Sequence, residues 1–169
     1  MNKPCNNLKS EIDKALALYL LYGQACMSDE RIGDQVRLYK ESILQTDSMM
    51  LETGVVEACT RCAADKGSCC FTEMGESYGC LQLFVNLLLG SELPGDADFT
   101  GTCHFVGARG CKLQARHSYC LNYFCPDLKN LLGEREIMKI QIQVGEQLLI
   151  GWELERTLAE RIADATRHD

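Results

Sequence analysis

Apolar side chains recur at intervals of three and four residues near the N-terminus, the spacing that places them on one face of an α-helix. Two such stripes are formed by Leu8, Ile12, Leu16, Tyr19 and Leu20, and by Ile32, Val36, Tyr39 and Ile43. They predict an antiparallel pair of helices over residues 8–48. Gly23 is expected to end the first helix and Ser28 to cap the second. Ala17, Leu18 and Leu21 widen the first stripe, so the first helix should be well buried.

The C-terminal part shows the same spacing over a longer stretch without proline. Its apolar positions are Ile137, Ile140, Val144 and Leu148, followed with a shift by Ile150, Leu154, Leu158 and Ile162. This pattern predicts one long helix over residues 134–167. Gly145 and Gly151 lie inside it, and each costs roughly 1 kcal/mol relative to alanine. They are therefore expected to permit the close approach of another segment or to mark a bend.

The middle of the chain has little periodicity. Glycines punctuate residues 59–79, a short helix with Gly90 after its end is predicted around 81–88, and residues 91–102 read as a loop. The segment from Cys103 to Cys111 predicts a tight hairpin, because Gly107 and Gly110 permit the turn. The predicted fold class is therefore mainly α, as a single domain over 1–169. Helices from both termini pack around a loop-rich cysteine module at 59–125 with at most a small hairpin.

Composition and charge limit the classes of function that the sequence allows. The chain has 169 residues, 46% of them apolar, and a net charge of −7 with a pI near 5.0. This charge argues against a nucleic-acid partner, which requires a basic face. The apolar run from Ala15 to Leu21 is too short to span a bilayer, and Glu11 and Asp13 interrupt any signal peptide. These features predict a cytoplasmic protein without a membrane span.

Cysteine is the residue type with the strongest chemical implication. Nine of the eleven cysteines lie between Cys59 and Cys125. Thiols gathered in one stretch of an intracellular protein usually hold metal rather than form disulfides. A loop-rich segment buries little apolar surface, so a metal centre is the expected source of the free energy that orders it.

The order and spacing of these cysteines resemble the CxxCxxCC family of putative zinc- or iron-chelating proteins, which are often described as iron–sulfur proteins. The first half of the signature is Cys59-Thr-Arg-Cys62 followed by Cys69-Cys70. The second half, C-x-F, G-C and R-P-x-x-C-R-x-(aromatic)-x-C, corresponds to Cys103-His-Phe105, Gly110-Cys111 and the segment from Arg116 to Cys125. Here His117 replaces the proline and Leu121 the second arginine. The resemblance implies eight ligands: Cys59, Cys62, Cys69, Cys70, Cys103, Cys111, Cys120 and Cys125.

Eight thiolates suit two zinc sites, one four-iron cluster with thiols to spare, or two clusters. Zinc usually takes two compact pairs of cysteines, whereas iron–sulfur clusters accept ligands from scattered loops, so a 4Fe-4S cluster is preferred and zinc is the alternative. Cys80 and His104 are possible extra ligands, and His117, like His104, lies beside a cysteine of the signature and could replace a thiolate. Cys5 and Cys26 are expected to be plain small apolar residues or exposed thiols. Basic residues that could offset thiolate charge are Arg61, Lys66, Arg109, Lys112 and Arg116.

The predicted function is therefore electron transfer, or service as a redox component for a protein partner, through an iron–sulfur cluster. One alternative is a zinc protein with a structural or regulatory role, in which the metal folds the middle loops and presents a surface to a partner. Another is an enzyme whose metal keeps an open coordination position. The resemblance extends to modules of enzymes such as flagellin lysine methylases, but no catalytic residues can be assigned from this sequence.

Overall fold

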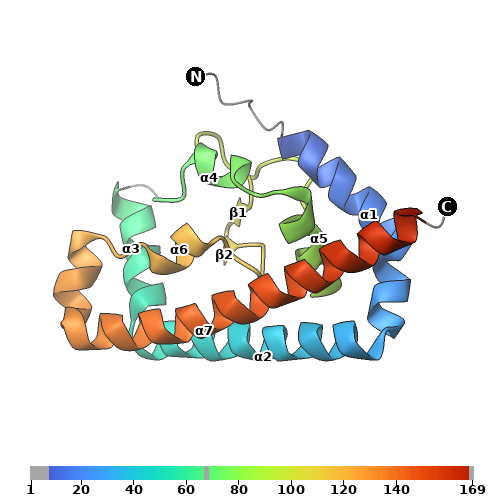
Figure 1. The fold of residues 1–169 in the computed structure, drawn as a ribbon. Coiled ribbons are helices and arrows are strands. Elements are labelled where there is room, and N and C mark those ends of the chain that lie inside the picture. Colours follow the sequence, from blue (N-terminus) through green and yellow to red (C-terminus); the bar gives the residue numbers. More distant parts are fainter. Residues whose placement is uncertain (1–7, 67–68, 168–169) are drawn as a thin grey trace, which may run out of the picture.

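The computed structural model describes residues 8–66 and 69–167, with the side chains of all of these except 62–66. Within those ranges the protein is mainly helical, with one two-stranded hairpin (Figure 1). The helices are α1 (Leu8–Ser28), α2 (Glu30–Glu52), α3 (Val55–Lys66), α4 (Thr72–Glu76), α5 (Cys80–Leu88), α6 (Ser118–Asn122) and α7 (Pro126–Arg167). The strands are β1 (Val106–Gly107) and β2 (Gly110–Cys111). The predicted mainly α class with a small hairpin is confirmed.

The two longest helices, α2 and α7, lie side by side and antiparallel along one edge of the molecule (Figure 1). Asp29, rather than Ser28, caps α2, because its carboxylate accepts a hydrogen bond of 3.1 Å from the backbone N–H of Ile32. Gly151 of α7 faces Tyr39 of α2 so closely that an added Cβ would lie 2.7 Å from the phenol ring. Gly151 thus permits a close approach, one of its two predicted roles.

Helix α1 differs from its prediction in two ways. It continues through Gly23 to Ser28, and it packs mainly on α5 instead of lying along α2 (Figure 1). Its buried residues are Ile12, Ala15, Gly23 and Cys26. Leu20 and Leu21, by contrast, are 85% and 72% exposed. Apolar residues occur on every side of this helix, so its sequence pattern did not specify which stripe is buried.

Helix α7 contains the predicted helix over 134–167 and extends it toward the N-terminus. Gly133 has a φ of 72°, outside the helical range, so α7 is two helices joined at a kink. The first, from Pro126, begins with proline, which suits the first turn of a helix because its missing N–H has no partner there.

The middle region is more helical than predicted. Cys59 and Cys62 lie on α3, three residues apart, and not in an irregular loop. The hairpin is confirmed: Val106 pairs with Cys111 and Gly107 with Gly110, whose φ of 101° favours glycine. No helix in the described ranges combines the length and the apolar character needed to cross a membrane.

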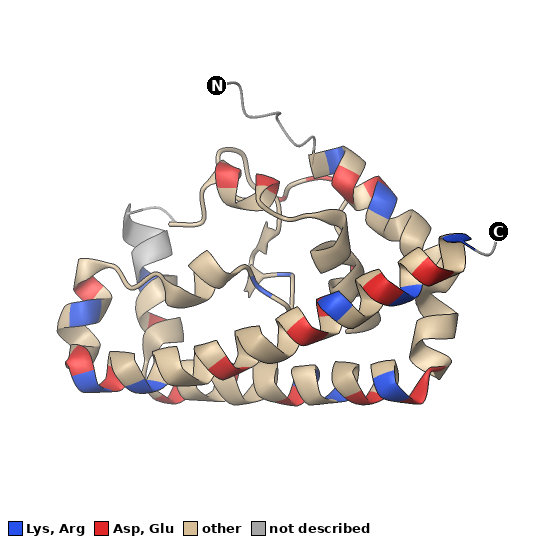
Figure 2. Cartoon of the chain, in the orientation of Figure 1, with Lys and Arg blue, Asp and Glu red and all other residues tan. Residues whose placement is uncertain are grey.

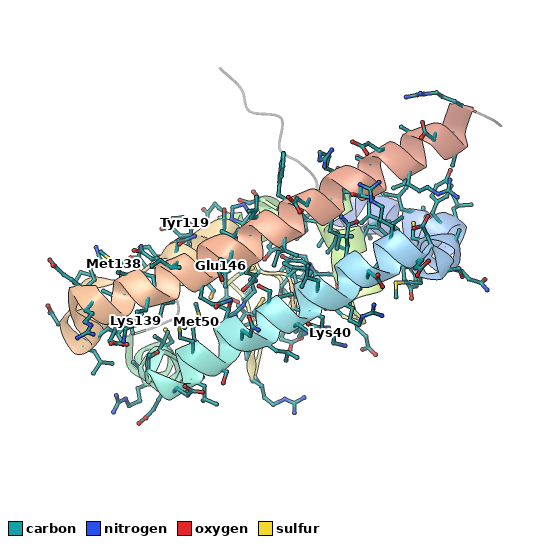
Figure 3. All side chains as sticks on the ribbon, turned by 60° about the horizontal axis from the view of Figure 1, so that its bottom comes forward. Lys40, Met50, Tyr119, Met138, Lys139 and Glu146 are labelled. Carbon is teal, nitrogen blue, oxygen red and sulfur yellow. The ribbon has the colours of Figure 1, made fainter. Side chains whose placement is uncertain are left out.

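Two apolar clusters form the core of the described residues. One joins α1, α5, the N-terminal half of α2 and the C-terminal half of α7, and also includes Cys103, Phe105 and Leu113. The other joins the opposite halves of α2 and α7 to α3 and to the segment around α6. Met50 belongs to the second and lies between α2 and α7, whereas Met138 lies on the outside of α7 (Figure 3). Charged residues follow the outer helices, while α5 and α6 carry none (Figure 2).

Candidate metal centre

Four of the eight predicted ligands gather in one place. Cys70 precedes α4, Cys103 precedes β1, Cys111 lies in β2 and Cys120 lies on α6. The thiols are close enough for their charges to interact. Cys70 raises the pKa of Cys103, and Cys70 and Cys103 both raise the pKa of Cys111. All three raise the pKa of Cys120. We call these four residues the thiol cluster.

Backbone and ring contacts hold the segments of the thiol cluster together. The backbone N–H of Cys103 donates a hydrogen bond of 2.8 Å to the backbone carbonyl of Cys70, 33 positions earlier. The hairpin brings Cys103 and Cys111 together, since it reverses the chain between them. The ring of Phe71 lies 6.5 Å from that of Tyr119, centroid to centroid, which places the Cys70 segment against α6. Three separate stretches of sequence therefore meet at the cluster.

Two of the thiols already have backbone donors beside them. The backbone amide of Phe105 interacts with the sulfur of Cys103, and that of Leu113 interacts with the sulfur of Cys111. The side chains of Phe105 and Leu113 are buried, at 0% and 2% exposure, so each amide is fixed in place by the core. Amide hydrogen bonds to cysteine sulfur stabilise the thiolate form and tune metal centres. In both cases the residue two positions after the cysteine is apolar and buried, and its backbone amide forms part of a thiolate site.

Burial raises the pKa of Cys103, Cys111 and Cys120, and the neighbouring thiols raise it further. For Cys120 the pKa rises to about 12. Cys111 and Cys120 reach the surface as residues, so it is their thiol groups that are desolvated. A nucleophilic cysteine requires a lowered pKa, so these three thiols do not fit that role. A bound metal ion would reverse the balance, because it deprotonates the thiols that coordinate it.

The basic side chain of Arg116 acts on the cluster. It partly offsets the raised pKa values of Cys111 and Cys120, and its guanidinium also pairs with Asp47 of α2. Two of the other basic residues predicted to offset thiolate charge pair elsewhere: Lys112 with Asp98 at 2.6 Å and Arg61 with Glu57 at 3.7 Å. Among these described side chains, Arg116, the arginine of the resembled motif, is the one that interacts with the thiols.

Tyr78 forms the inner side of the site and was not predicted. It is 2% exposed, and its phenol oxygen accepts a hydrogen bond of 2.7 Å from the backbone N–H of His117. Burial raises its pKa, and Cys111, Cys120 and Cys103 raise it further, so the phenol lies near all three thiols. A tyrosine just before a predicted helix carries no sequence signal for such a role.

The spacing of the thiols bears on which group they fit. No three His, Cys, Asp or Glu side chains among those described are positioned to hold a metal ion as they stand. A single tetrahedral zinc draws its sulfurs to about 2.3 Å from the ion, hence close to one another. An iron–sulfur cluster places several irons and sulfides between its cysteines. Four thiols are the usual number of protein ligands for either group.

Of the other predicted ligands, Cys59 is exposed on α3, Cys69 is exposed and directly precedes Cys70, and Cys125 packs against the second apolar cluster. The backbone of Cys62 lies in α3, but its side chain is outside the described residues, as is all of Cys5. Cys26 is 1% exposed in the core, as predicted for a small apolar residue.

The possible extra ligands have other neighbours. Cys80 begins α5, where its backbone N–H donates a 2.9 Å hydrogen bond to Glu11 of α1. His104 Nε2 lies 2.8 Å from the carbonyl oxygen of Pro94. His117 caps α6: its Nδ1 accepts a hydrogen bond of 3.2 Å from the backbone N–H of Tyr119, and burial lowers its pKa. These contacts give all three residues structural roles.

A pocket of about 220 Å³ adjoins the centre. It lies among α2, α5, α7 and the segment before α6, and its polar lining residues include Tyr39, Gln82, Arg116, Ser118 and Glu155. Arg116 therefore contributes to the pocket and also acts on Cys111 and Cys120.

The fold and the site together define a mainly helical protein with a cluster of four cysteine thiols, drawn from three segments, beside a buried tyrosine. The chain matches none of the protein-family models, and comparisons with the curated proteins and with the solved structures found no significant match.

Proposed function

We propose that this protein binds an iron–sulfur cluster, with the thiol cluster as its core ligands, and acts in electron transfer or as a redox component for a protein partner. The observation that carries the proposal is the gathering of Cys70, Cys103, Cys111 and Cys120 from three segments, with backbone amides directed at two of the sulfurs. When bound, such a cluster accepts and donates single electrons.

The surroundings of the thiols support this role. Cys111 and Cys120 are exposed, so one edge of the centre is open to the surface, as transfer to a partner requires. Cys103 is buried, and its backbone is tied to Cys70. The exposed aromatic side chains of Phe71, Tyr119 and Tyr123 lie along the same edge. Aromatic residues are enriched at protein interfaces, so this edge is where a protein partner would dock.

Four further cysteines, Cys59, Cys62, Cys69 and Cys125, remain ligands that the motif resemblance implies. They would complete a second centre or replace a member of the thiol cluster. The alternative of a zinc protein with a structural or regulatory role uses the same residues, and elemental analysis distinguishes it from the proposal.

The test is anaerobic purification followed by measurement of iron and acid-labile sulfide per chain. We expect both to be present, and we expect Cys103→Ala and Cys120→Ala to lose most of them. Cys26→Ala is the matched control: it also removes a buried thiol, but on α1, where the charged neighbours are Asp29 and Arg161, so its iron content should equal that of the wild type. Stoichiometric zinc without sulfide, even after anaerobic reconstitution with iron and sulfide, would reject the proposal.

The adjoining pocket favours a second candidate, an enzyme whose metal keeps an open position. Arg116 connects the pocket to the thiols, and the pocket has room for a small polar molecule. In that case an added ligand such as azide or cyanide should change the electron paramagnetic resonance spectrum of the reduced, loaded protein. An unchanged spectrum argues for a fully coordinated cluster and hence for electron transfer.

A further inference from the structure

Tyr78 is held rigidly beside the thiol cluster. It lies between α4 and α5, and its ring makes edge contacts with two other rings. The centroid of Phe105 is 5.1 Å away and that of His117 is 5.8 Å away. Such edge-to-face contacts fix the orientation of an aromatic ring in addition to burying it. The position of the hydroxyl group is therefore determined by the core and does not depend on a bound ligand.

The Tyr78 hydroxyl group accepts one hydrogen bond and is still able to donate one. The His117 backbone N–H donates to its oxygen at 2.7 Å. Among the hydrogen bonds between described residues, none has the Tyr78 hydroxyl as the donor. A phenol that accepts a hydrogen bond can still donate its own hydrogen, and a buried donor without an acceptor costs free energy. Because the His117 amide occupies one side of the oxygen, the hydrogen is directed away from it.

Segments that carry the thiols surround this hydroxyl group. His117, its hydrogen-bond donor, is the N-cap of α6, which bears Cys120, and Phe105, whose ring lies against Tyr78, follows Cys103 by two residues. Ionisation of Cys111, Cys120 or Cys103 would oppose ionisation of Tyr78, which agrees with this placement. A tyrosine hydroxyl keeps its hydrogen at neutral pH. Thiols are weak acceptors, whereas the thiolates and sulfides of a metal centre carry negative charge and accept much stronger hydrogen bonds.

We propose that the Tyr78 hydroxyl donates a hydrogen bond to a sulfur of the metal centre and thereby raises its reduction potential. The inference rests on the proposed function and goes one step further, because it names the residue that tunes the centre. Reduction adds one electron, so the sulfurs of the reduced centre are more negative and accept a stronger hydrogen bond than those of the oxidised one. The bond therefore stabilises the reduced form, and its loss lowers the potential.

The test compares Tyr78→Phe with the wild type in the iron-loaded protein. Phenylalanine keeps the ring and its contacts with Phe105 and removes only the hydroxyl group. We expect unchanged iron and sulfide content and a lower midpoint potential in an anaerobic dye-mediated titration. Tyr19→Phe is the control: it removes a hydroxyl from an exposed tyrosine on α1 whose ring lies against Phe84, so its potential should equal that of the wild type. Electron paramagnetic resonance in deuterated buffer gives a second readout. The reduced centre of the wild type should couple to one exchangeable proton, and this coupling should be absent in Tyr78→Phe.

The possible outcomes separate the two proposals. An unshifted potential in a fully loaded Tyr78→Phe protein overturns the tyrosine assignment and leaves the proposed function intact. If Tyr78→Phe fails to load, 3,5-difluorotyrosine at position 78 keeps the hydroxyl and makes it a stronger donor. The potential should then rise, and an unchanged value overturns the assignment. Wild-type protein that holds zinc alone rejects the proposed function. The tyrosine is then tested on cobalt-substituted protein, whose sulfur-to-metal charge-transfer band must shift in Tyr78→Phe if the hydrogen bond exists.

Discussion

Asn86 and Ala115 exchange two hydrogen bonds in the interior of the protein. The Asn86 side-chain amide donates to the Ala115 carbonyl oxygen at 3.0 Å, and its own carbonyl oxygen accepts from the Ala115 backbone N–H at 2.9 Å. Asn86 is completely buried on α5, within an otherwise apolar stretch. The pair attaches the segment between β2 and α6 to the core, and that segment carries Arg116, which acts on the thiols.

Replacing Asn86 with leucine should destabilise the protein strongly. The substitution keeps the branching of the side chain but leaves the buried N–H and C=O of Ala115 without partners, at a cost of roughly 2–5 kcal/mol. Chemical denaturation measures the free energy of unfolding. Asn130→Leu is the control, because Asn130 is exposed on α7 and its replacement should change stability by no more than about 0.5 kcal/mol. Equal effects of the two substitutions would mean that the Asn86–Ala115 pair does not hold this segment.

Two glycines of α7 should respond to alanine in opposite directions. At Gly151 a new Cβ would lie 2.7 Å from the Tyr39 ring, so Gly151→Ala must displace this buried ring and should cost about 1–3 kcal/mol. At Gly145 an added Cβ meets nothing within 4 Å, so Gly145→Ala should stabilise by about 0.5–1 kcal/mol through the helix propensity of alanine. Thermal unfolding of the two variants provides the comparison. Stabilisation by both would contradict the close packing of α2 against α7.

His117→Pro should be tolerated and should leave metal binding intact. The φ of His117 is −58°, which proline adopts without strain, and the resembled motif has proline at this position. The substitution removes the hydrogen bond to Tyr78 and the side-chain cap of α6, so a loss of about 1–2 kcal/mol in stability is expected. Iron analysis of the variant is the decisive measurement. Loss of iron would identify His117 as a ligand.

Glu155 should make the folded protein less stable as the pH rises, whereas a carboxylate paired with a basic residue makes it more stable. Burial raises its pKa above the ordinary value of 4.5, so the folded protein binds this proton more tightly than the unfolded chain does. The contribution is fully present below pH about 4.5 and is lost as the pH rises through the higher folded-state pKa. Glu155→Gln should therefore become increasingly stable relative to the wild type as the pH rises from 4.5 to 8.

The control for this pH dependence is Glu153→Gln, an exposed position on the same helix. Its difference from the wild type should stay constant over the same pH range. A Glu155→Gln profile parallel to that of the wild type would show that the buried carboxyl does not titrate differently in the folded state.

The sequence predicted a helix and its buried face correctly where the apolar stripe coincides with the side of the helix that is buried. In α2, the apolar stripe of Ile32, Val36, Tyr39 and Ile43 is the buried face. In α1, apolar residues occur on all sides, so the pattern gave the helix but neither its buried face nor its partner. Gly23 did not end α1, because glycine inside a helix costs only roughly 1 kcal/mol, which packing can offset. The helical placement of Cys59 and Cys62 was missed because a run of short and polar residues lacks a clear stripe.

For the thiol cluster, cysteine spacing marked eight residues as candidate ligands but did not predict which of them gather. Which of eight thiols meet is set by long-range packing, such as the contact of Phe71 with Tyr119 and the hydrogen bond from Cys103 to Cys70. Neither leaves a signal in local sequence. Tyr78 and Asn86 were missed for the same reason, since each acts on a segment about 30 to 40 positions away. A single asparagine inside an apolar helix was the one available clue, because a buried amide requires partners.

The hydrogen bond from the Cys103 amide to the Cys70 carbonyl uses only backbone atoms, so it forms whether or not a metal is present. The two segments that carry Cys70 and Cys103 are therefore held next to each other before any metal binds. If the proposed cluster binds here, the polypeptide can complete its folding first and receive the metal afterwards through the exposed side at Cys111 and Cys120. Maturation would then depend on a delivery step acting on a nearly finished protein, in contrast to small zinc domains that fold only around their ion.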